Sequence, residues 1–77
     1  MITARAIRIA RQAIPALHRA TGARAVLLVA DRIVVVPPTD ADIAAAQAMG
    51  GRLVGVYRRP IDVEALGEAV REVADGR

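Results

Sequence analysis

Apolar residues are densest in the middle of the chain, in two short runs that predict strands. The runs are Ala25–Ala30 and Ile33–Val36, and only Asp31 and Arg32 separate them. Short runs rich in Val, Ile and Leu and bounded by turn residues are typical of buried strands. Because the spacer has two residues, we expect a β-hairpin, with a longer loop that includes Ala30 and Ile33 as the alternative. Neither run alternates with polar residues, so we expect both faces of the sheet to be covered.

The segment before the hairpin has a helical pattern from residue 3 to about residue 20. Its apolar residues recur at spacings of three and four and form one stripe, which consists of Ile2, Ala6, Ala10, Ala13, Ile14 and Leu17. Thr3 is suited to cap the start of this helix. Pro15 lacks a backbone N–H, so we expect a kink near residues 11–14, or a break after which Pro15 opens a second short helix.

The second half of the chain predicts a helix, a strand and a last helix. Pro37 and Pro38 end the second strand, and Thr39 is a suitable N-cap for an alanine-rich helix that ends at Gly50-Gly51. Residues 52–58 predict a third strand, in which Gly55 marks a bulge or a close approach. Asp62 is suited to cap the last helix, whose apolar stripe is Val63, Leu66, Ala69, Val70 and Val73.

The order of these elements, α-β-β-α-β-α, predicts a single small α/β domain over residues 1–77, with α+β as the alternative class. The strand, helix and strand between Ile33 and Arg58 are long enough for a crossover. We therefore expect a three-stranded mixed sheet that contains the hairpin and one parallel βαβ crossover. No linker, internal repeat or low-complexity segment divides the chain.

Composition limits the chemistry that the protein can perform. The chain has no Cys, Ser or Lys and a single His, so the usual nucleophiles and any disulfide are missing. We therefore expect a protein that is not an enzyme and needs no cofactor. No apolar run approaches the ~20 residues of a membrane span. The first residues lack the apolar centre of a signal peptide, and the expected compartment is the cytoplasm.

The size of the chain favours association. With 77 residues, the protein buries only about 60% of the surface that its unfolded chain exposes, so its core is marginal. Small chains without disulfides often gain stability by forming oligomers. We therefore expect an intracellular interaction or regulatory module that forms a homodimer through a sheet edge or through helix faces. A different protein is the alternative partner.

Charge is distributed unevenly and suggests an alternative function. Residues 1–24 carry five arginines and no acid, whereas residues 61–77 carry five acids and two arginines. An arginine-mediated nucleic-acid-binding protein would contact phosphates through Arg5, Arg8, Arg19, Arg24, Arg58 and Arg59. The competing interpretation is that the acidic last helix neutralises the basic first helix, within one subunit or across a dimer. A membrane-surface role is a further alternative, although the first helix lacks Trp and Phe anchors.

Three other groups of residues are candidate sites. Asp40 and Asp42 begin a helix and could hold Mg²⁺, but helix capping accounts for both, and no third carboxylate is well placed. His18 has no second metal ligand or nucleophile. Tyr57, the only aromatic residue, is expected to pack in the core rather than to stack on bases. The sequence therefore predicts no catalytic residue and no metal site.

Overall fold

The structure, a computed structural model, describes residues 3–76. Its elements are α1 (Ala4–Arg11), α2 (Ile14–Arg19), β1 (Arg24–Val29), β2 (Arg32–Val36), α3 (Asp40–Ala48), β3 (Arg52–Tyr57) and α4 (Val63–Asp75). Met1, Ile2 and Arg77 lie outside the described residues. Two predictions therefore concern residues that the structure does not describe: that Ile2 belongs to the first apolar stripe, and that the domain covers residues 1–77 up to both ends.

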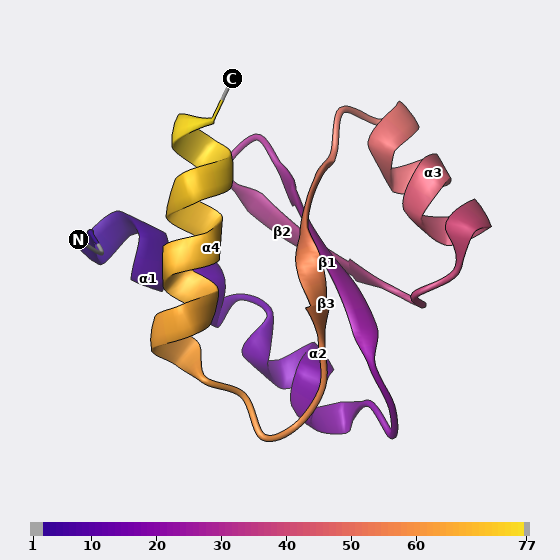
Figure 1. Ribbon diagram of the computed structural model, residues 1–77, viewed down its shortest axis with the longest axis horizontal. Helices are drawn as coiled ribbons and strands as arrows, with labels where there is room; N and C mark the ends of the chain where they lie inside the picture. The colour runs from indigo at the N-terminus through magenta and orange to yellow at the C-terminus, as the bar shows by residue number, and fades with distance from the viewer. Residues whose placement is uncertain (1–2, 77) are drawn as a thin grey trace.

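The three strands form one antiparallel sheet in the order β2-β1-β3. In Figure 1, α1 and α4 lie to the left of the strands and α3 lies to the right. The helix α2 packs on the same side as α1 and α4, since its Leu17 belongs to their core. The chain is therefore a small α+β domain, the class that the sequence left as the alternative.

The predicted mixed sheet and its parallel βαβ crossover are wrong. Both β2 and β3 run antiparallel to β1, so these two strands share a direction, but β1 lies between them. The connection through α3 therefore passes over β1 and joins β2 to β3, which are not neighbours in the sheet. The residues from Ala25 to Leu28 are all buried in β1. A strand that is apolar on both faces is best covered at the centre of the sheet, with a neighbour on each side.

The predicted hairpin is confirmed, but its turn comes one residue earlier than expected. Val29 pairs with Arg32, which leaves Ala30 and Asp31 as the two turn residues. Ala30 adopts a φ of +54°, as tight two-residue turns require at their first position. Asp31 forms an ion pair with Arg5 of α1, so the turn is attached to the first helix.

The first helix breaks before Pro15, which is the second of the two predicted outcomes. α1 ends at Arg11, and α2 begins at Ile14 with Pro15 in its first turn. At the break, the Gln12 side chain reaches the start of β2. Its Oε1 accepts a hydrogen bond from the Ile33 N–H at 3.0 Å, and its Nε2 donates to the Asp31 carbonyl at 3.5 Å.

The predicted helix caps are confirmed. Thr3, Thr39 and Asp62 each accept a hydrogen bond at 3.1 Å from the backbone N–H three residues later. At the end of α3, Gly50 has a φ of +92°, and its N–H donates to the Gln47 carbonyl. The Gly51 N–H donates to the Ala46 carbonyl, which completes the motif that commonly ends helices at glycine.

Apolar residues form two clusters on opposite faces of the sheet, because successive residues of β1 point to opposite faces. The larger cluster lies under α1, α2 and α4, and its buried members are Ile9, Ala10, Ala13, Leu17, Val26, Leu28, Leu66 and Val70. The smaller one lies under α3 and contains Ala25, Leu27 and Ala46, with Val36 and Ile43 packed against it. Between residues 3 and 76, no helix combines the length and apolarity needed to cross a bilayer.

Candidate functional site

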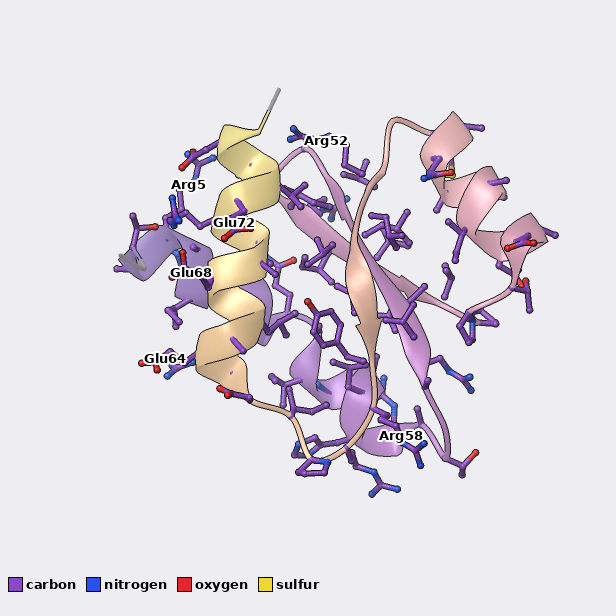
Figure 2. The ribbon with its side chains drawn as sticks, viewed as in Figure 1. Arg5, Arg52, Arg58, Glu64, Glu68 and Glu72 are labelled. Carbon is purple, nitrogen blue, oxygen red and sulfur yellow. The ribbon has the colours of Figure 1, made fainter. Side chains whose placement is uncertain are left out.

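The six arginines predicted to contact phosphates do not form one surface. Arg5 lies near the hairpin turn, where it pairs with Asp31. Figure 2 shows Arg5 and Arg58 at opposite ends of the molecule. Arg8 lines a hollow beside α1 together with Arg11 and Glu64. The fold therefore separates Arg5 and Arg8 from the other four arginines.

The remaining four, Arg19, Arg24, Arg58 and Arg59, gather where the α2–β1 and β3–α4 loops meet; we call this region the basic end. Arg24 pairs with Tyr57 in the sheet register, so Arg58 and Arg59 follow directly beside the start of β1. The two loops surround an open hollow of about 590 Å³. Its lining residues are His18, Ala20, Thr21, Gly22, Arg58, Arg59, Pro60 and Ile61, none of which is acidic.

The arginines of the basic end are not used in ion pairs within the part of the chain that the structure describes. The ion pairs there join Arg5 to Asp31 and Arg71 to Glu68 and Asp75. Arg24 donates a hydrogen bond to the Ala23 carbonyl at 3.2 Å. The guanidinium groups of Arg19, Arg58 and Arg59 are thus available to an external anion.

The acidic helix α4 packs beside α1 within the same chain (Figure 1). Glu64, Glu68 and Glu72 follow the length of α4 in Figure 2. Glu68 accepts a hydrogen bond at 3.0 Å from Nε of Arg71, and this bond holds the pKa of the Glu68 carboxyl below its usual value. Of the α1 arginines, Arg5 pairs with Asp31, and Arg8 and Arg11 share a hollow with Glu64 of α4. These carboxylates weaken the part of the α1 arginines in the predicted phosphate-binding surface.

Asp42 takes part in a helix cap. Its N–H donates to Oγ1 of Thr39, and the Thr39 hydroxyl donates to the Asp42 carboxylate. Among residues 3–76, no three His, Asp or Glu side chains lie close enough together to hold a metal ion. The capping interpretation of Asp42 therefore has direct support in its contacts.

Tyr57 packs against the larger core, as predicted. A Cβ atom added to Gly55 would lie 3.0 Å from Cε2 of the Tyr57 ring, so Gly55 makes room for the ring. The sheet register also shifts between Val26 and Leu27, opposite Gly55, which confirms the predicted irregularity. Burial raises the pKa of the Tyr57 hydroxyl. With its ring in this position, Tyr57 does not offer a platform for base stacking.

The sequence analysis did not identify an exposed apolar group on the other side of the sheet. Met49, Leu53 and Val56, which together we call the apolar face, are 75%, 40% and 52% exposed. In the register, Leu53 lies opposite Leu27 and Val56 lies opposite Ala25, so both strand residues belong to the face that α3 covers. The helix α3 is rich in alanine, whose short side chain covers little of that face. This alanine content is the sequence feature that could have indicated the exposure.

The free edges of the sheet carry features that hinder strand pairing. On β2, the Gln12 amide occupies the Ile33 N–H and the Asp31 carbonyl, and Pro37 and Pro38 follow the strand. On β3, the register shift disturbs the regular ladder. Bulges, prolines and covered edge groups are common protections against edge-to-edge association. The apolar face is therefore a better candidate surface for association than a strand edge.

Two surfaces stand out as candidate functional sites: the apolar face on the α3 side and the basic end at the α2–β1 and β3–α4 loops. They are formed by different elements and have different chemistry. Comparison with known proteins finds no matching family model, no matching curated protein and no matching solved structure.

Proposed function

We propose that the protein is a small non-enzymatic interaction module that acts as a homodimer through its apolar face. The observation that carries this proposal is the exposure of Leu53 and Val56 on the α3 side of the sheet, together with Met49 at the end of α3. Large apolar side chains that group together on the surface of a small protein mark sites of association.

A second copy of the chain is the partner that this surface fits best. In a two-fold dimer the same patch meets itself, so each apolar residue is buried on both subunits. Full burial of a Val, Leu or Met side chain is worth about 1.5–3 kcal/mol. Covering the exposed parts of three such side chains per subunit yields several kcal/mol, which must also offset the entropy of association. We therefore propose a dimer of moderate affinity that adds stability to a marginal core.

The non-enzymatic part of the proposal rests on the residues available. His18 lines the hollow at the basic end, but the chain contains no Ser or Cys that it could activate. The cytoplasmic location expected from the sequence stays a prediction.

Sedimentation velocity over a range of protein concentrations tests the proposal. We expect the mass of the unchanged protein to rise from that of one chain to that of two, and a variant with Leu53→Gln and Val56→Thr to stay monomeric. Ala65→Gln, on the exposed side of α4, is the matched control and should dimerise normally. Circular dichroism verifies that all three proteins are folded. A protein that is monomeric at every concentration, or a double variant that still dimerises, would contradict the proposal.

A further inference from the structure

The basic end concentrates positive charge. Its four arginines come from α2, from β1 and from the segment after β3. Arg58 and Arg59 line the hollow, and no carboxylate does. The nearest acid in the sequence, Asp62, follows the lining residue Ile61 and caps α4. Arginine has a planar guanidinium group that binds phosphate through two parallel hydrogen bonds. The chain also has a net charge of +3, which favours the approach of an anionic partner.

The shape of the basic end favours an extended ligand over a small one. The hollow is open, and the four arginines of the basic end come from three separate segments, so one phosphate group would not engage all of them. Tyr57, the only aromatic residue of the chain, is partly buried against the larger core, so its ring is not free to stack on a nucleobase. A chain of regularly spaced phosphates meets these conditions.

The side of the hollow that the α2–β1 loop forms is accessible to such a chain of phosphates. A Cβ atom added to Gly22 would meet no other atom within 4 Å, so the turn leaves open space above this residue. Gly22 is one of the lining residues and lies in the α2–β1 loop, just before β1. A phosphate backbone can therefore approach the α2–β1 loop closely while Arg58 and Arg59 contact it from the neighbouring loop.

We infer that the basic end binds the phosphate backbone of nucleic acid without reading its base sequence. This inference does not depend on the proposed dimer, because the apolar face lies on other residues. Arg19, Arg24, Arg58 and Arg59 supply the phosphate contacts, whereas Arg5 and Arg8 lie outside the site.

Fluorescence anisotropy with short labelled duplexes of two unrelated sequences tests this inference. We expect equal affinity for both sequences, and a slope of about −3 to −4 for log K against log salt between about 50 and 200 mM NaCl, because each phosphate contact contributes about −0.9. Arg58→Gln with Arg59→Gln should weaken binding by more than about tenfold and reduce the slope by about two. The matched control, Arg5→Gln with Arg8→Gln, should change affinity by less than about twofold because neither arginine contacts the ligand.

A second pair of variants tests the position of the site. Gly22→Glu places a carboxylate in the hollow and should abolish binding, whereas Gly22→Gln has a similar size without the charge and should retain most of it. Vesicles containing phosphatidylserine serve as the other anionic probe, and we expect nucleic acid to bind more tightly. No binding to duplexes at low salt, stronger binding to the vesicles, or an equal loss in the Arg5 and Arg8 control would overturn the inference.

Discussion

Ala30 holds a backbone conformation that is unfavourable for its side chain. Among residues 3–76 it is the only non-glycine residue with a positive φ. For L-amino acids this region costs roughly 1–2 kcal/mol. The hydrophobic pattern alone placed the turn one residue later, at Asp31 and Arg32. In the observed register, the Asp31 carboxylate pairs with Arg5, and the Asp31 carbonyl accepts a hydrogen bond from the Gln12 side chain. Both partners lie about twenty or more positions earlier in the sequence.

Replacing Ala30 with glycine should stabilise the protein by about 0.5–1 kcal/mol, because the relief of strain exceeds the extra entropy of the unfolded glycine. Urea unfolding followed by circular dichroism measures the change. Ala23→Gly is the matched control, since Ala23 precedes β1 and has no positive φ, and this variant should not be stabilised. A lower stability for the Ala30→Gly variant would show that the turn is not strained.

The candidate phosphate contacts illustrate what residue type alone can indicate. The excess of arginine in the first 24 residues was visible in the sequence. Which arginines share a surface was not, since Arg24 and Arg58 meet only because β1 pairs with β3. Charge is a property of single residues, whereas a binding surface depends on how distant segments are brought together.

Among the elements, the ends of helices were predicted most accurately. The caps at Thr3, Thr39 and Asp62 and the glycine end of α3 all depend on hydrogen bonds between residues a few positions apart. Such contacts form in much the same way whatever the rest of the chain does. The break at Pro15 is of the same kind, because the missing N–H acts within one helical turn.

Gly51 provides a test at this scale. A Cβ atom at this position would lie 2.7 Å from the Ala46 carbonyl oxygen and 3.3 Å from Cγ2 of Val29. Gly51→Ala should therefore destabilise the protein by about 1–3 kcal/mol, as overpacking commonly does. Gly22→Ala, which has open space, should have a much smaller effect. Thermal unfolding of the two variants compares them, and equal stabilities would mean that the end of α3 is not packed as described.

For the whole molecule, the two sides of the sheet differ in how firmly they are packed. Three helices cover one face and bury Leu17, Leu66 and Val70 almost completely. On the other face, α3 contributes Ala46 to the smaller cluster, and Ile43 is only partly buried. Local stability follows the amount of buried apolar contact, so α3 is the helix most easily separated from the sheet.

Native-state hydrogen exchange should show that α3 opens at a lower free energy than β1 and α4. The measurement is made at low protein concentration, because a second copy on the apolar face, as proposed above, would protect α3. Ile43→Ala should reduce protection mainly in α3, whereas Leu66→Ala should lower the stability of the whole chain by about 2–5 kcal/mol. An equal opening free energy for α3 and β1 would contradict this prediction and show that the domain unfolds as one cooperative unit.

The kinds and approximate bounds of the strands and helices, the hairpin and the helix caps could all be predicted from the sequence. These features depend on the local pattern of apolar residues and on hydrogen bonds over a few positions. The tertiary structure alone decided that β3 pairs with β1, that Leu53 and Val56 stay exposed beside α3, and which arginines form the basic end. Strand order depends on contacts between segments that lie far apart in the sequence, such as the pairing of β3 with β1, so the pattern within one segment does not specify it by itself.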